Sequence, residues 1–236
     1  EKYKDELEGN KQFKYDDTSY RLCHELQGFK RELKDEIFEG WHDYDISAAM
    51  PSIFWGLHQQ FQPKKFSNPG VVASIQSLPF MAHYINNKAA VRQGLANSIG
   101  IDLDAAKSII NGLFQRMRLA PHWTCSAFEL VGYSAIKMNA LKADPFIMGL
   151  RKDIVKFWAR TGKRINTDRH YEGLPHIKKN LLYFHYERQV LDVVRKCLVD
   201  QDAIYFLEHD GFRTKEKVDL AEIRNRVKDE TGFDLI

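Results

Sequence analysis

Two aspartates end two segments that the sequence predicts as strands. Asp45 closes the segment 41–46, in which an apolar residue recurs at every second position, and Asp210 follows the apolar run 203–207. Carboxylates at the ends of neighbouring strands can hold two Mg²⁺ ions, which prefer oxygen ligands and leave positions open for substrate phosphates. The alternative interpretation is structural, because Asp also forms turns and Asp-Gly is itself a common hairpin turn. Only a fold that brings these distant residues together would make them a metal site.

The residues that follow Asp45 resemble a polymerase motif. Residues 45–53 read Asp-Ile-Ser-Ala-Ala-Met-Pro-Ser-Ile and are similar to motif A of family B DNA polymerases in the Asp, the Pro-Ser-Ile and the spacing. The resemblance implies that Asp45 binds metal and that the backbone carbonyl of Ile46 is a further ligand. Met50 stands where that family keeps a Tyr under the nucleotide sugar, which implies a softer wall and weaker discrimination against ribonucleotides. A buried Met on a helix is the structural alternative.

Two further segments resemble motifs of family A polymerases. His209 and Asp210 are similar to motif C of family A DNA polymerases and of single-subunit phage RNA polymerases, where a His-Asp dipeptide stands at the turn of a hairpin. This implies that Asp210 is the second metal-binding carboxylate and that His209 positions the primer. Residues 105–114 are similar to motif B of family A, which implies a nucleotide-binding role for Lys107 and Asn111. The three motifs occur in the order A, B, C.

Motif B departs from the family pattern in one respect. The Arg that usually precedes its Lys by three or four residues is missing, and Leu103 and Asp104 stand in those places. A helix just upstream offers Lys88 and Arg92, which are four residues apart and therefore share one face. Either helix is expected to contact the incoming nucleotide. The mixture of family A and family B features is similar to a divergent phage or plasmid polymerase.

Basic residues concentrate between positions 151 and 169, where seven Lys or Arg occur with two aromatic residues among them. Such a patch suits contacts with a phosphate backbone, and we expect Lys163, Arg164 and Arg169 to bind nucleic acid. Glu187 lies on a long predicted helix and is expected to face the primer-template, by resemblance to family A. A solvated helix face is the alternative for these residues, because charged side chains are ordinary at protein surfaces.

Composition and spacing argue against several other classes of protein. Of 236 residues, 35 are Lys or Arg and 32 are Asp or Glu, so the net charge of +3 does not itself require a polyanionic partner. Three widely spaced cysteines fit a reducing cytoplasm better than a disulfide framework. His122 and Cys125 have the spacing of two zinc ligands, but no second pair completes such a site. No apolar run reaches the roughly 18 residues of a membrane span, and no Gly-rich phosphate loop occurs.

Short-range patterns predict the elements that must position these residues. We expect strands at 41–46 and 203–207, a second hairpin strand after Asp210 and a last strand at 233–236. Apolar residues spaced three and four apart predict helices at 17–40, 73–98, 102–118, 124–142, 145–160 and 176–199, with one more after Asp219. Asp102 and Asp219 have the residue type and position of helix caps.

These elements predict an α+β fold. We expect a polymerase-like palm with a small antiparallel sheet, built from residues 1–60 and 176–236, and a large helical fingers-like insertion at residues 61–175. The chain does not begin with Met and stops inside an apolar stretch, so we expect it to be a piece of a longer protein.

The expected activity is template-directed nucleotidyl transfer by a DNA-directed DNA polymerase that uses two Mg²⁺ ions, for which Mn²⁺ could substitute. Its partners would be a DNA primer-template, nucleoside triphosphates and accessory replication proteins, with no membrane. We expect it in the cytoplasm, which for a phage or plasmid protein is that of the host. An RNA polymerase of the single-subunit type or a primase-like polymerase is an alternative with the same chemistry. A non-catalytic helical DNA-binding module of a replication system is an alternative of a different class.

Overall fold

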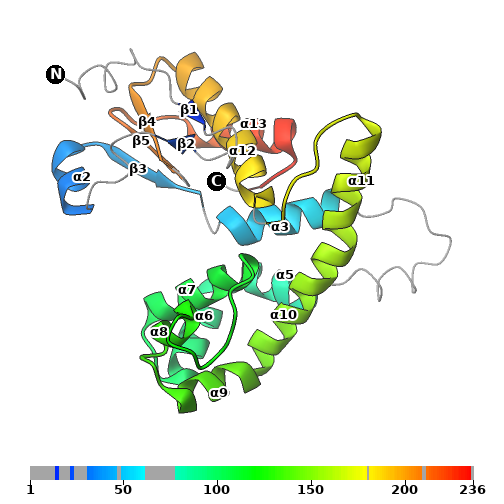
Figure 1. Cartoon of the computed structure of the whole chain (residues 1–236). Helices are drawn as coiled ribbons and strands as arrows, with labels where there is room; N and C mark the ends of the chain where they lie inside the picture. The colour runs from blue at the N-terminus through cyan, green and yellow to red at the C-terminus, as the bar shows by residue number, and fades with distance from the viewer. Residues whose placement is uncertain are drawn as a thin grey trace. The chain divides into compact units, whose positions relative to one another are not determined.

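The computed structural model of the chain describes residues 14–15, 22–23, 31–46, 49–61, 78–179, 181–208 and 211–234. The chain divides into two compact units. Residues 1–56 with 181–236 form one, here called the sheet unit, and residues 57–180 form the other, the helical unit. These limits lie within five residues of those expected from the sequence. The described elements form a mixed α+β structure that is mostly helical, as the sequence predicts (Figure 1).

The sheet unit contains an antiparallel sheet made from two distant parts of the chain. Its strands are β3 (His42–Asp45), β5 (Gly211–Thr214) and β4 (Tyr205–Leu207), in that spatial order. Strand β3 pairs with β5 from His42 opposite Thr214 to Asp45 opposite Gly211. The predicted strand at 41–46 and the predicted hairpin after residue 203 are therefore confirmed, and they meet in one sheet.

The region before β3 differs from the sequence expectation. A single helix was expected over residues 17–40, but the described part of this range contains β2 (Leu22–Cys23) and only a short helix, α2 (Arg31–Ile37). Strand β2 pairs antiparallel with β1 (Lys14–Tyr15). Helix α2 ends at Ile37, three residues before the expected end at Gly40, and Gly40 adopts a left-handed φ of 77°, which favours glycine.

Aromatic side chains fix the two faces of the sheet. The ring of Phe38, just after α2, lies 4.8 Å from the ring of Phe206 on β4 and 5.1 Å from that of Trp41. Tyr44 and Phe212, which are paired in register, stack with their ring centroids 4.9 Å apart. Because side chains alternate along a strand, these two groups lie on opposite faces, so both faces of the sheet are covered.

Helices complete the core of the sheet unit. The long helix α12 (Leu182–Asp200) precedes β4 and packs against α13 (Leu220–Thr231). Asp219 caps α13 as predicted, since its carboxylate accepts hydrogen bonds from the backbone N–H groups of Ala221 and Glu222 at 2.9 and 3.1 Å. The buried ring of Phe233 follows α13, and no strand is described at 232–234, contrary to expectation.

Helix α3 (Ala49–Gln60) follows β3, and the boundary between the two units falls within it. The ring of Phe233 explains why α3 has a glycine at position 56. A Cβ atom at Gly56 would lie 2.5 Å from the Phe233 ring, closer than real contacts allow. Pro51 lies in the first turn of α3, as its fixed φ predicts.

The described part of the helical unit is built mainly from α-helices. They are α5 (Pro79–Asn86), α6 (Lys88–Ile99), α7 (Leu103–Phe114), α8 (Ser126–Leu130), α9 (Ala135–Ala143), α10 (Pro145–Phe157) and α11 (Lys163–Tyr171). A π-helical turn, Trp158–Gly162, joins α10 to α11. Apolar side chains from α7 and α10 are fully buried, among them Ile109, Ile110 and Leu150. No helix in the described ranges is long and apolar enough to cross a membrane.

Side-chain caps set where several of these helices begin. Asp102 caps α7 as predicted, accepting a hydrogen bond from Ala105 N at 2.6 Å.

Two predicted helices are each divided in the structure: 73–98 is interrupted at Asn87, and 124–142 is interrupted where Gly132 and Tyr133 both adopt positive φ. The expected helix at 145–160 instead continues through the π-helical turn to Tyr171.

Candidate active site at the end of the sheet

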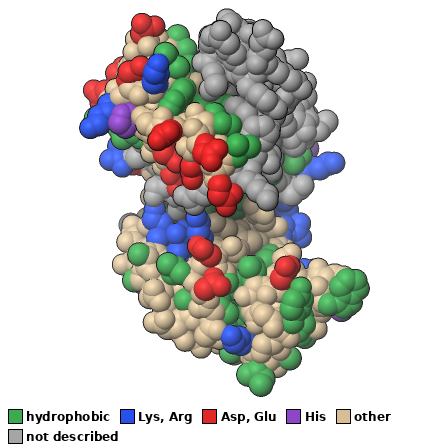
Figure 2. Space-filling model, turned by 90° about the vertical axis from the view of Figure 1, so that its left-hand side faces the viewer, with side chains coloured by type: hydrophobic (Ala, Val, Ile, Leu, Met, Phe, Trp, Pro, Cys, Tyr) green, Lys and Arg blue, Asp and Glu red, His purple; other side chains and the backbone are tan. Residues whose placement is uncertain are grey.

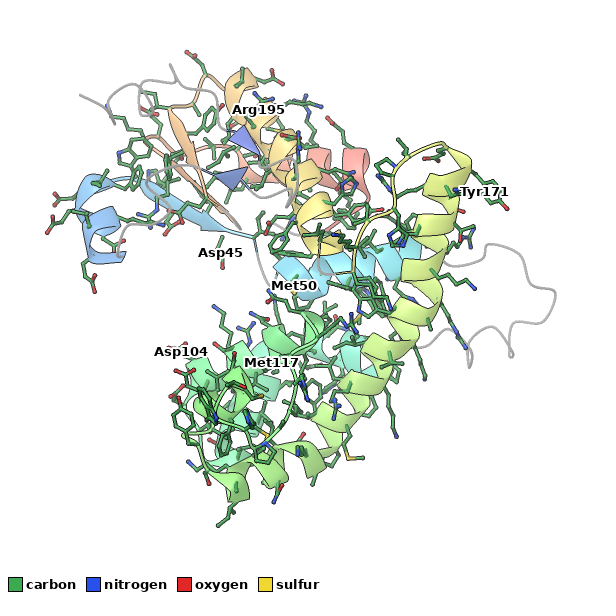
Figure 3. All side chains as sticks on the ribbon, viewed as in Figure 1. Asp45, Met50, Asp104, Met117, Tyr171 and Arg195 are labelled. Carbon is green, nitrogen blue, oxygen red and sulfur yellow. The ribbon has the colours of Figure 1, made fainter. Side chains whose placement is uncertain are left out.

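The end of the β3–β5 ladder carries the candidate site. Asp45 is the last residue of β3, its side chain is exposed, and its register partner is Gly211, the first residue of β5 (Figure 3). Asp210 and His209 lie outside the described residues. The residues on either side of them are described, and the backbone N–H of Glu208 donates to the carbonyl of Gly211 at 2.9 Å. The hairpin therefore closes where the sequence predicts.

Gly211 allows the two strands to approach closely at Asp45. A Cβ atom built on Gly211 would lie 2.4 Å from the backbone oxygen of Tyr44 and 3.4 Å from the Cα atom of Asp45. The first of these distances is a clash with backbone, which cannot move aside as a flexible side chain can. Sequence reasoning treated this glycine only as part of an Asp-Gly turn and missed its role as a spacer beside Asp45.

Asp45 belongs to an acidic face of the sheet unit. Asp43 and Asp45 are two residues apart on β3 and therefore point to the same side of the sheet. Exposed carboxylates gather on α2, on the turn that follows it and on β3: Glu32, Asp35, Glu36, Glu39, Asp43 and Asp45 (Figure 2). A surface lined mainly by one sign of charge raises the local concentration of counterions, so this face attracts cations.

A buried arginine balances part of that negative charge. Arg213 on β5 is 8% exposed, and its guanidinium lies 3.2 Å from Asp43 Oδ2, 3.6 Å from Asp35 Oδ1 and 3.5 Å from Glu208 Oε1. It also lies 5.2 Å from the centre of the Phe38 ring. Arg213 thus ties α2, β3 and the hairpin turn together.

Sequence reasoning did not single out Arg213. One signal was available, since Arg213 is a charged residue within the short segment expected to form the second strand of the hairpin.

The two other motif A residues are buried. Ile46 is 2% exposed, and its carbonyl, expected as a metal ligand, accepts a hydrogen bond from Ala49 N at 3.2 Å at the start of α3. A carbonyl oxygen has two lone pairs, so this bond leaves one acceptor position. Met50 is 8% exposed and lies in the first turn of α3. Met50 is therefore a buried residue on a helix, as expected if its role is structural.

The predicted nucleotide-binding residues lie on two packed helices of the helical unit. Lys88 and Arg92 are on α6, and Lys107 and Asn111 are on α7. Arg92 donates a hydrogen bond from Nε to the hydroxyl of buried Tyr84 at 2.9 Å, which gives it a structural role that sequence reasoning did not predict. Lys107 is exposed.

Asn111 differs from its neighbours in hydrogen bonding. Its Oδ1 atom is buried and makes no hydrogen bond within the described part of the chain. A buried acceptor without a hydrogen-bond partner usually lowers the stability of the folded state. Asn111 is therefore a candidate for an interaction with a ligand.

Two of the residues expected to contact nucleic acid make hydrogen bonds within the helical unit. Arg164 donates to the carbonyl of Phe61 at 3.2 Å, and Arg169 donates from Nε to the carbonyl of Pro175 at 2.9 Å. Lys163, by contrast, is exposed at the start of α11. The basic segment therefore contains both structural arginines and an accessible lysine.

The expectation that Glu187 faces bound nucleic acid does not fit its position. Its side chain is 4% exposed and accepts a hydrogen bond from the hydroxyl of Tyr183, one turn earlier on α12. A carboxylate that is buried and hydrogen-bonded within its own helix offers little surface to a ligand.

The other candidate metal ligands are not grouped. His122 contacts Thr124 through Nδ1 at 2.8 Å, and the Cys125 thiol donates to the carbonyl of Arg118 at 2.8 Å. Among the residues that the structure describes, no three or more His, Cys, Asp or Glu side chains are grouped so that they could hold a metal ion. This statement covers Asp45 but not Asp210.

Comparison of the chain with protein-family models, with curated proteins and with solved structures finds no match. The functional interpretation therefore depends on the residues and geometry of this chain.

Proposed function

We propose that this chain is the core of a template-directed nucleotidyltransferase, a DNA-directed DNA polymerase, with Asp45 and Asp210 as its metal-binding carboxylates. The observation that carries the proposal is the register of the sheet, in which Asp45 is opposite Gly211. Gly211 is bonded directly to Asp210. We therefore expect the carboxylate of Asp210 to lie at the same end of the sheet as that of Asp45.

Elementary distances support this pairing. Directly paired residues of an antiparallel ladder have Cα atoms about 4.5–5.5 Å apart, and consecutive residues have Cα atoms about 3.8 Å apart. Two-metal sites hold their ions about 3.5–4 Å apart, with metal–oxygen bonds of about 2.0–2.1 Å for Mg²⁺. Carboxylates that extend from two adjacent strand ends suit a site of this size.

Three described residues of the sheet have roles in the proposed reaction. Asp45 supplies an exposed carboxylate, Gly211 lets the two strands approach, and Arg213 holds β3 against the hairpin. Bound Mg²⁺ would lower the pKa of a primer 3′-hydroxyl and offset the charge of the leaving pyrophosphate. In the helical unit, the exposed ammonium group of Lys107 suits the triphosphate of an incoming nucleotide.

A primer-extension assay tests this proposal. A labelled primer-template is incubated with the chain, Mg²⁺ and either deoxyribonucleotides or ribonucleotides. We expect extension with deoxyribonucleotides, and we expect Asp45→Asn and Asp210→Asn each to lower the rate at least about 100-fold, since metal ligands contribute several kcal/mol to the transition state. Extension only with ribonucleotides would assign the chain to RNA synthesis.

Glu39→Gln is the matched control, because Glu39 is another exposed carboxylate of the same acidic face. It should retain most of the activity. The proposal would be wrong if the unmodified chain extends no primer with either nucleotide set, or if Asp45→Asn is as active as Glu39→Gln. Either result would favour a non-catalytic DNA-binding module whose aspartates only form turns.

A further inference from the structure

The helical unit contains a pocket beside its π-helical turn. Helix α10 continues through Trp158–Gly162 into α11, and π-helical turns inside α-helices are frequent at functional sites. The ring of Trp158 lies over the backbone of Gly162, where a Cβ atom would be only 2.6 Å from the ring. Glycine at this position lets the indole ring form one wall of the pocket.

The segment after α11 folds back and forms the opposite wall. Asn166 binds both backbone groups of Ile177, accepting from its N–H at 2.8 Å and donating to its carbonyl at 3.1 Å. Arg169 donates to the carbonyl of Pro175, and the side chain of Ile177 is 1% exposed. The pocket is therefore held by specific hydrogen bonds in the free chain.

The chemistry of the lining favours an anion that carries an aromatic group. The pocket has a volume of about 570 Å³, within the usual range for small ligands. Its basic and aromatic lining residues are Trp158, Lys163, His170, Tyr171, His176 and Lys179, and no Asp or Glu is among the residues that line it. Lys179 Nζ lies 5.7 Å from the centre of the Trp158 ring.

We propose that this pocket binds one nucleotide of an unpaired single strand of nucleic acid. The base would stack on the exposed ring of Tyr171, which projects from the end of α11 (Figure 3), and the adjacent phosphates would contact Lys163 and Lys179. Aromatic stacking with lysine contacts is the usual chemistry of single-strand binding, and it tolerates any base. A duplex would not fit, because its bases are stacked and paired and cannot enter a pocket.

This site is separate from the strand-end carboxylates and does not depend on catalysis. Between residues 145 and 179 the chain has nine Lys or Arg and three Asp or Glu, a local excess of positive charge in a chain whose net charge is only +3. Because Arg164 and Arg169 bond to backbone carbonyls, we assign strand binding to the two lysines in the pocket.

Fluorescence anisotropy with a short labelled oligo-dT strand tests the proposal. Tyr171 is 83% exposed, so Tyr171→Ala should leave the fold intact while raising the Kd about 5- to 150-fold, the range expected for loss of one stacking contact. Lys163→Ala with Lys179→Ala should reduce the steepness of log K against log salt by about 1.4, since each phosphate contact with a single strand contributes about 0.7.

Matched controls lie in the same unit but outside the pocket. Trp123→Ala removes an aromatic side chain that is 75% exposed, and Arg116→Ala with Arg118→Ala removes two exposed charges from the segment after α7. Both controls should bind oligo-dT with a Kd within about twofold of the unmodified chain.

The proposal is overturned if Tyr171→Ala binds as tightly as Trp123→Ala, or if a blunt duplex competes as well as unlabelled oligo-dT. It is also overturned if free dTMP displaces the strand at equal concentration, because the pocket would then be a mononucleotide site. Asp45→Asn should bind oligo-dT normally, so a failure of the proposed catalysis is distinguishable from a failure of this site.

Discussion

Asp45, the last residue of β3, is paired in register with Gly211, the first residue of β5. The two strands come from opposite ends of the chain, and the glycine has no side chain to separate them. Any substrate or ion that binds at this end of the sheet therefore meets the carboxylate of one strand beside the hairpin turn of the other.

Gly211→Ala should disturb this junction. The added Cβ atom would lie 2.4 Å from the backbone oxygen of Tyr44, so β5 has to shift, and we expect a loss of about 1–3 kcal/mol in the free energy of unfolding. Urea unfolding followed by circular dichroism measures it. Gly94→Ala on α6 is the control, because nothing lies within 4 Å of its added Cβ, and it should gain up to about 1 kcal/mol. Equal stability of the two variants would contradict the close approach.

Arg213→Met should destabilise the sheet unit. Removing one partner of a buried ion pair costs about 3–5 kcal/mol, and the exposure of Asp35 and Asp43 places the expected loss near the lower end, about 3 kcal/mol. The control is Arg224→Met, whose pair with Asp234 is exposed on both sides and should change stability by less than about 0.5 kcal/mol. If the melting temperature falls by the same amount in both variants, Arg213 does not hold the sheet together.

Asp153→Ala should destabilise the helical unit. This buried carboxylate on α10 accepts hydrogen bonds from the N–H groups of Phe80 and Met81 at 2.8 and 3.1 Å, and so caps α5 from a distant part of the chain. Loss of a cap that leaves buried donors unsatisfied costs about 1–3 kcal/mol. Chemical denaturation should show this loss but only a small change for Asp168→Ala, whose carboxylate is half exposed. Similar losses in both would argue against the capping role.

The same carboxylate should make stability depend on pH. Burial raises the pKa of Asp153, and the N–H groups of Met81 and Phe80 offset only part of that effect. The folded state therefore binds the proton more tightly than the unfolded state, whose pKa is about 3.9, and stability decreases as the pH rises from there through the folded pKa. Asp153→Asn does not titrate, so the free energy of unfolding of the unmodified chain, relative to this variant, should be greater near pH 3.5 than near pH 7. A constant or reversed difference would contradict this.

Met50→Tyr distinguishes packing from sugar recognition. Met50 is 8% exposed, so a larger side chain should overpack the start of α3 and lower the free energy of unfolding by about 1–3 kcal/mol. Met148→Tyr is the control, because Met148 is 44% exposed and should tolerate the change. An unchanged melting temperature, with a roughly 10- to 200-fold rise in the kcat/KM ratio for deoxyribonucleotides over ribonucleotides, would instead place Met50 in the nucleotide pocket.

Short-range sequence patterns predicted the strands and helices whose formation depends on neighbouring residues. The strand that ends at Asp45, the hairpin after residue 203 and the helices that begin behind Asp102 and Asp219 are all observed. Alternation of apolar residues and a capping carboxylate act within a few residues, so they can be recognised without knowing the rest of the chain. The same patterns overestimated helix at residues 17–40, where β2 pairs with β1 instead.

Side-chain partners could not be predicted in this way, because they come from distant parts of the chain. Nothing near Arg92, Arg164 or Glu187 indicates that the first two hydrogen-bond to Tyr84 and Phe61, or that the third is buried on α12. The acids at residues 45 and 210 were recognisable as candidates from their types and positions. That Asp45 is paired with Gly211 is shown only by the register of β3 and β5, since strand pairing is set by packing across the whole sheet unit.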